Sequence, residues 1–159
     1  MTDRTYSFTR GGTILGYAYG LALFLLALTG FAQMPIFKRY YIADIPGLGW
    51  LAEFYTTHFL HYLGASVILA IAAYSAADYF LATRRHRRLS TSGTIRAVLL
   101  LAILASGALL AIRNSIFAPF SPGVVTTLLL SHMGLTVVFL MTILYCRISG
   151  RPWTKTVRQ

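Results

Sequence analysis

The sequence predicts an all-α integral membrane protein, a bundle of four transmembrane helices with both termini in the cytoplasm. Hydrophobic residues make up 57% of the 159-residue chain, and charged residues make up only 11%. The apolar residues also gather into runs of about twenty, which suit a hydrocarbon core of roughly 30 Å. A soluble domain of this size cannot bury so much apolar surface. The sequence shows no internal repeat, low-complexity segment or linker, so we expect one domain over residues 1–159.

The four predicted spans follow from the positions of these apolar runs. They cover residues 12–32, 51–81, 95–112 and 123–146. Each is long enough to cross a bilayer at about 1.5 Å per residue, and the second is long enough to project beyond it. We expect the first span to be a true membrane helix, because its apolar run is longer than that of a signal peptide and lacks a small-residue cleavage site.

The basic residues predict the topology of the chain and argue against a nucleic-acid partner. The net charge is +10, and the chain has 14 Lys and Arg residues. Two precede the first span, five lie between the second span and the first turn of the third, and four follow the last, whereas Lys38, Arg39 and Arg113 lie on the other side. This is the positive-inside pattern. We expect the arginines of residues 84–88 to contact anionic lipids, and His86 among them to be a solvated surface residue.

Histidines inside the spans are the most informative residues for function. An ionisable side chain in hydrocarbon is costly and is usually functional. His61 lies ten residues after Leu51 and His132 nine residues after Gly123, in two spans that run in the same direction. We therefore expect the two imidazoles at similar depth, where they would serve as the axial iron ligands of one low-spin haem b. The alternative is that they are hydrogen-bond partners that hold the helices together.

Several neighbours of these histidines are candidate contacts of the haem. His58 shares a helix face with His61, and it is a candidate for a ligand or for a contact with a propionate or a quinone headgroup. Gly64 would let a flat macrocycle approach the backbone. Arg113 could pair with a propionate, although a snorkelling arginine has the same sequence signature. The candidate quinone contacts near the haem are His58, Tyr55, Gln33 and Lys38.

Two other features have structural interpretations. Gly12, Gly16 and Gly20 form a ridge of small residues, typical of close packing against a helix of this chain or of another subunit. The single cysteine, Cys146, excludes an internal disulfide and a haem attachment by paired cysteines. The chain has no acid–base pair, nucleophile constellation or phosphate loop, so we predict no catalytic residues.

Three short motifs resemble the cytochrome b (gamma) subunit of membrane-bound formate dehydrogenases and of related hydrogenases and thiosulfate reductases. They are Leu28-Thr-Gly-Phe31, His61-Tyr-Leu-Gly-Ala65 and Ser131-His-Met-Gly134. The resemblance implies a four-helix bundle that passes electrons between an iron–sulfur subunit outside and a quinone near the inner face. His61 and His132 match the positions that bind the outer haem of that family.

The chain departs from this family at the inner haem. Two histidines normally bind that haem, one from the first span and one about four turns beyond the outer ligand on the fourth. Here no histidine precedes His58, and Cys146 lies fourteen residues after His132. The resemblance therefore implies a variant with one haem, and it leaves the position of the quinone site open.

We therefore expect a haem b-binding membrane anchor and electron-transfer subunit of a multi-subunit respiratory oxidoreductase. It would lie in the cytoplasmic (inner) membrane of a bacterium and pass electrons between a periplasmic-side redox partner and the quinone pool, menaquinone or ubiquinone. Its expected partners are an iron–sulfur or cytochrome subunit and a catalytic subunit. The competing hypothesis is a haem-free membrane anchor or assembly subunit of a larger complex.

Overall fold

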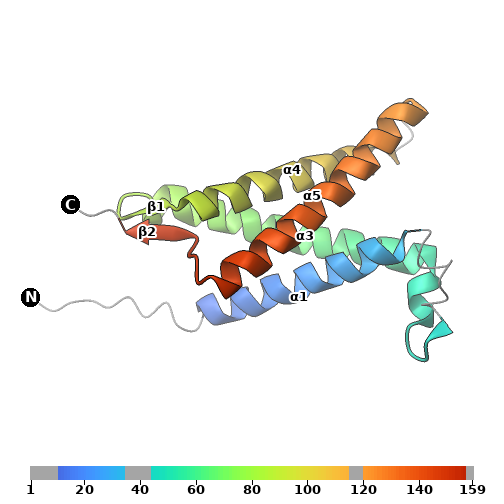
Figure 1. Cartoon of the computed structure of the whole chain (residues 1–159), viewed down its shortest axis with the longest axis horizontal. Helices are drawn as coiled ribbons and strands as arrows, with labels where there is room; N and C mark the ends of the chain where they lie inside the picture. The colour runs from blue at the N-terminus through green and yellow to red at the C-terminus, as the bar shows by residue number, and fades with distance from the viewer. Residues whose placement is uncertain (1–10, 35–43, 115–119, 157–159) are drawn as a thin grey trace, which may run out of the picture. The chain divides into compact units, whose positions relative to one another are not determined.

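The structure, a computed structural model, describes residues 11–34, 44–114 and 120–156 and is mainly helical in these ranges (Figure 1). Four of its helices are long and apolar enough to cross a membrane: α1 (Gly11–Ala32), α3 (Phe54–Asp78), α4 (Thr91–Arg113) and α5 (Pro122–Ile148). The shorter elements are the 3-10 helix η2 (Gly49–Ala52), the π-helix η3 (Tyr79–Thr83) and the strands β1 (Arg87–Leu89) and β2 (Thr154–Thr156). The prediction of an all-α membrane fold with four spans is confirmed.

The chain divides into two compact units, Met1–Ala77 and Asp78–Gln159. The described part of the first unit contains α1, η2 and nearly all of α3, whereas the second contains η3, α4, α5 and both strands. The boundary falls where α3 passes into the π-helical turn η3, which continues the second predicted span to Thr83.

In the first unit, α1 and α3 lie against each other in antiparallel directions. Gly30 of α1 contacts His61 of α3, and Leu26, one turn earlier on α1, contacts Gly64, which comes later on α3. Gly64 is buried, and a Cβ atom at this position would lie 3.1 Å from Cγ of Leu26. The absence of a side chain at Gly64 therefore allows the two helices to approach closely.

The glycine ridge of α1 has no such contact. Gly16 and Gly20 are exposed, and a Cβ atom at either position would meet no atom within 4 Å. Within the described part of the first unit, no helix packs on these two glycines. Packing of the ridge on a helix of another subunit stays a prediction.

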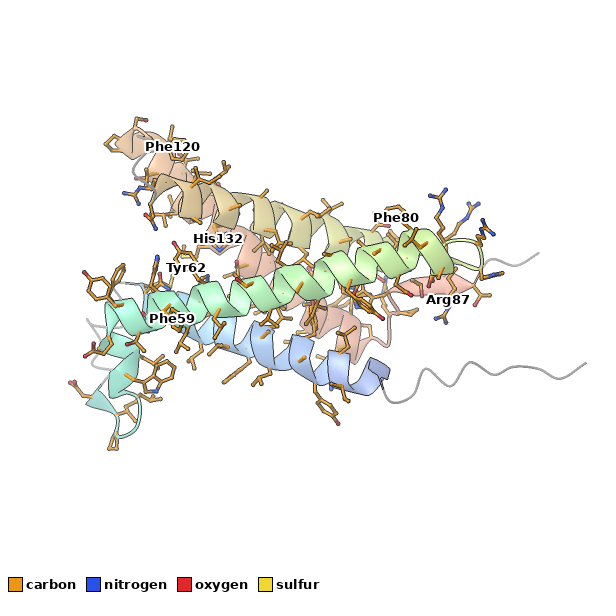
Figure 2. All side chains as sticks on the ribbon, turned by 180° about the vertical axis from the view of Figure 1, so that it is seen from behind. Phe59, Tyr62, Phe80, Arg87, Phe120 and His132 are labelled. Carbon is orange, nitrogen blue, oxygen red and sulfur yellow. The ribbon has the colours of Figure 1, made fainter. Side chains whose placement is uncertain are left out.

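Large apolar side chains cover the outside of all four spanning helices. Leu21 of α1, Phe59 of α3, Leu101 of α4 and Met141 of α5 are each at least 60% exposed, and Phe59 is labelled on its helix in Figure 2. Helices satisfy their backbone hydrogen bonds internally, so lipid can take the place of protein on such surfaces. These surfaces are those of a multi-pass membrane protein.

In the second unit, a tight turn at the end of α5 directs the chain back toward α4. Gly150 adopts a left-handed conformation, with φ of +61°. The N–H of Arg151 donates to the carbonyl of Cys146 at 2.9 Å, which is the bond of a Schellman motif. After this turn β2 pairs antiparallel with β1, so that Leu89 lies opposite Thr154.

The residues after this turn fasten onto the first turn of α4. The Ser90 hydroxyl accepts a hydrogen bond from the Gly93 N–H at 2.9 Å, which caps the helix, and donates to the Pro152 carbonyl at 2.7 Å. Arg96 is only 5% exposed, and its guanidinium lies 4.1 Å from the centroid of the Trp153 ring. We call this set, Ser90, Gly93, Arg96, Pro152 and Trp153, the C-terminal clasp.

Gly93 provides a test of the C-terminal clasp. We expect Gly93→Ala to destabilise the protein by about 1–3 kcal/mol, because its Cβ would collide with the Trp153 carbonyl oxygen. Gly123→Ala is the matched control, since a Cβ at Gly123 meets nothing within 4 Å. Unfolding of both variants in mixed micelles by increasing dodecyl sulfate measures the difference. Equal stability of the two variants would contradict this account of the clasp.

Candidate functional site

In the first unit, the candidate site is built around His61, seven residues after the first residue of α3. Its Nδ1 lies 3.1 Å from Oγ1 of Thr29 on α1, a residue with no exposed surface. The Thr29 hydroxyl donates its one hydrogen to the Leu25 carbonyl at 2.7 Å. The hydroxyl must therefore accept from the imidazole, so Nδ1 of His61 carries a hydrogen and the lone pair of the neutral ring lies on Nε2.

The same arrangement occurs around His132 in the second unit. Its Nδ1 lies 2.9 Å from Oγ of Ser106 on α4, which is only 7% exposed. The Ser106 hydroxyl donates to the Ile103 carbonyl at 3.0 Å, so it accepts from Nδ1 of His132.

A glycine follows each of these hydroxyl residues in the sequence, and its Cα lies next to the imidazole ring. A Cβ atom at Gly30 would lie 3.3 Å from Cε1 of His61, and one at Gly107 would lie 3.1 Å from Cε1 of His132. These distances are shorter than ordinary carbon contacts. Each ring is thus held against the backbone of the preceding helix, at a position where a side chain would press on it.

The hydroxyl–glycine pairs Thr29-Gly30 and Ser106-Gly107 are the contacts of the two histidines that the sequence analysis did not identify. Their signal in the sequence is a small hydroxyl residue followed by glycine in the span before each histidine. We call each set, Thr29 and Gly30 with His61 and Ser106 and Gly107 with His132, a histidine seat. A neutral imidazole with its hydrogen on Nδ1 and its lone pair on Nε2 can ligate a metal or accept a proton through Nε2.

His58 has different surroundings, although it lies one turn before His61. Its Nδ1 is 3.1 Å from the Gln33 amide oxygen, which has no hydrogen, so the ring donates. Its Nε2 is 3.0 Å from the Tyr62 hydroxyl, and it accepts from that group. Phe54 stacks on the ring with centroids 5.2 Å apart. Both nitrogens of His58 therefore bond to side chains, and the two histidine seats distinguish His61 and His132 from it.

The other residues that the sequence predicts for the site lie outside the two histidine seats or outside the described ranges. Gly64 faces Leu26 of α1. Arg113 is exposed and is the last residue of α4. Tyr55 is 85% exposed and makes an edge contact with Phe54, and Lys38 lies outside the described residues.

The basic segment between the second and third spans forms the turn that leads into β1. His86 is exposed, in agreement with the sequence analysis, and four arginines of this segment are exposed with it (Figure 2 labels Arg87): Arg84, Arg85, Arg87 and Arg88. Cys146 is a free, buried cysteine in the last turn of α5.

The described ranges contain no group of three or more His, Cys, Asp or Glu side chains that could hold a bare metal ion. Haem iron differs, because the porphyrin supplies four of its ligands and the protein supplies only the axial ones. His61 of the first unit and His132 of the second are imidazoles, the kind of side chain that haem iron takes.

The fold and these contacts define the class of the chain: a multi-pass α-helical membrane protein with a hydrogen-bonded histidine in each of its two units. Comparisons of the chain with protein-family models, with curated proteins and with solved structures give no match. The function is therefore argued from the histidine seats themselves.

The hydrogen bond in the first seat can be measured directly. We expect Thr29→Val, which keeps the shape of the side chain, to cost about 1 kcal/mol of stability, because it leaves the Nδ1–H of His61 without its acceptor. Thr142→Val is the matched control, because the exposed Thr142 hydroxyl bonds to the Val138 carbonyl of its own helix. Unfolding in mixed micelles gives both values, and a loss no larger than that of the control would argue against the assigned bond.

Proposed function

We propose that the chain binds one haem b, which the imidazoles of His61 and His132 would hold. The observation that carries this proposal is the recurrence of the histidine seat, which gives both imidazoles a hydrogen on Nδ1 and a lone pair on Nε2. When bound, haem b supplies a one-electron couple of ferric and ferrous iron. The protein would then be the membrane anchor and electron-transfer subunit of a larger oxidoreductase.

The residues of each seat have distinct tasks in this proposal. Thr29 and Ser106 accept from Nδ1–H, which fixes the tautomer, orients the ring and makes Nε2 a stronger donor to iron. Gly30 and Gly107 let the rings lie close to the preceding helix. The apolar helices keep water away, and Arg113 at the end of α4 is the candidate partner of a haem propionate.

The proposal extends to the complex in which the chain works. The short motifs of the chain and the distribution of its basic residues support a subunit of a respiratory oxidoreductase in the inner membrane of a bacterium, with both termini in the cytoplasm. An iron–sulfur or cytochrome subunit would exchange electrons with the haem on the periplasmic side. The other redox partner would be a lipid-soluble quinone, menaquinone or ubiquinone.

The visible spectrum of the purified, dithionite-reduced protein tests the haem. We expect a b-type band that is lost in His61→Ala and in His132→Ala, because each removes an axial ligand. His58→Ala is the matched control, and it should keep the band, since both ring nitrogens of His58 bond to side chains. Intact haem in His132→Ala would refute the ligand assignment. A spectrum without a b-type band would instead favour the haem-free anchor.

The two hydroxyls should tune the haem without being needed to bind it. We expect the double variant Thr29→Val, Ser106→Ala to keep its b-type band and to show a higher midpoint potential. Without an acceptor for Nδ1–H, each imidazole is a weaker base and stabilises ferric iron less. A redox titration followed in the visible range measures the shift, and Thr142→Val serves again as the control. An unchanged or lower potential would contradict this role.

A further inference from the structure

We propose that the Gln33 amide, positioned by His58 and Tyr62, binds the polar headgroup of a quinone at the end of the first unit where α1 ends and α3 begins. This inference rests on the proposed function, because it assigns a site to the lipid-soluble partner of the haem. We call these three residues the headgroup cluster. They belong to one unit, and two hydrogen bonds join them.

The hydrogen bonds of the headgroup cluster have a defined direction. The Tyr62 hydroxyl donates to Nε2 of His58, and Nδ1–H of His58 donates to Oε1 of Gln33. The amide nitrogen of Gln33 takes part in neither of these two hydrogen bonds. It is buried and has no hydrogen-bond partner among the described residues.

A buried amide nitrogen without an acceptor is costly, by about 1–3 kcal/mol, and such groups in native proteins call for an explanation. The Gln33 amide nitrogen can only donate hydrogen bonds, so its missing partner must present an oxygen or nitrogen acceptor. A quinone presents two carbonyl oxygens. The unsatisfied atom therefore indicates the chemistry of the missing partner.

The surroundings of the headgroup cluster favour a flat, lipid-soluble ligand. Gln33 follows the last residue of α1, and His58 lies four residues after the first residue of α3, so the cluster lies at the ends of two membrane helices. Phe54 stacks on His58, and the Tyr62 ring meets His58 edge-on with centroids 4.5 Å apart. Tyr62 is 39% exposed, and Figure 2 shows it on the first turns of α3.

A haem propionate is the other source of an acceptor oxygen near His61. A carboxylate binds best to a cationic donor, whereas the described side chains of the headgroup cluster are an amide, an imidazole and a phenol. A neutral carbonyl oxygen suits the Gln33 amide, and a ligand with both ring and carbonyl suits the aromatic neighbours. We therefore assign the cluster to the quinone and let the experiment distinguish the two sources.

Calorimetric titration of the purified protein in detergent with the quinone analogue 2-heptyl-4-hydroxyquinoline N-oxide tests the site, because it does not depend on turnover. We expect Gln33→Leu to weaken binding about tenfold, the equivalent of one hydrogen bond, while the b-type band stays unchanged. Tyr62→Phe should weaken binding less, because it removes only the group that holds His58 against Gln33. Ser66→Ala is the matched control one turn further along α3, where the hydroxyl bonds to the Tyr62 carbonyl of its own helix. It should bind the analogue like the unmodified protein.

The outcomes separate the two proposals. Unchanged affinity in both variants, or no binding to the unmodified protein, would overturn the quinone site even where the b-type band is present. Loss of haem or a shifted potential in Gln33→Leu with unchanged affinity for the analogue would also overturn it, and would assign the amide to a propionate. Weakened binding in a protein without a b-type band would support the headgroup site and refute the haem.

Discussion

The hydrogen bond between a ring nitrogen and a hydroxyl on the neighbouring helix is the interaction on which each unit depends. A polar ring within the membrane has little water to bond with, so its N–H needs an acceptor inside the protein. Thr29 and Ser106 provide that acceptor, and each donates its own hydrogen to a carbonyl of its helix. Because the hydroxyl hydrogen is already used, the direction of the bond and the tautomer of the ring follow together.

The same bond sets how closely the helices pack. A hydroxyl and a ring nitrogen within about 3 Å require the two helices to approach, and the glycines at positions 30 and 107 make room for the ring. In the first unit Gly64 extends this approach by a further turn. Elsewhere the helices expose their large apolar side chains, because lipid tails are as suitable a neighbour for leucine as another helix is.

The sequence predicts the spans well, because the hydrocarbon core constrains each helix by length and polarity alone. All four spanning helices lie close to the predicted ranges, although the second begins at Phe54 and not at residue 51. The partners of the histidines could not be predicted in the same way, since they depend on the rotation of each helix about its axis. Thr29 belongs to the Leu28-Thr-Gly-Phe31 motif, but nothing in that motif or around Ser106 indicates a bond to a histidine. The correspondence between the seats also escapes a search for repeats, because it involves few residues at unequal separations, 32 and 26 positions.

The C-terminal clasp has a consequence for the order in which the chain matures. The first turn of α4 is completed by the carbonyls of Pro152 and Trp153, which follow Ser90 by about sixty positions in the chain. A ribosome must therefore synthesise the last two spans before Ser90 meets these partners. The clasp can close only after Pro152 and Trp153 have been synthesised, so its closure would follow the synthesis of both helices of the second unit.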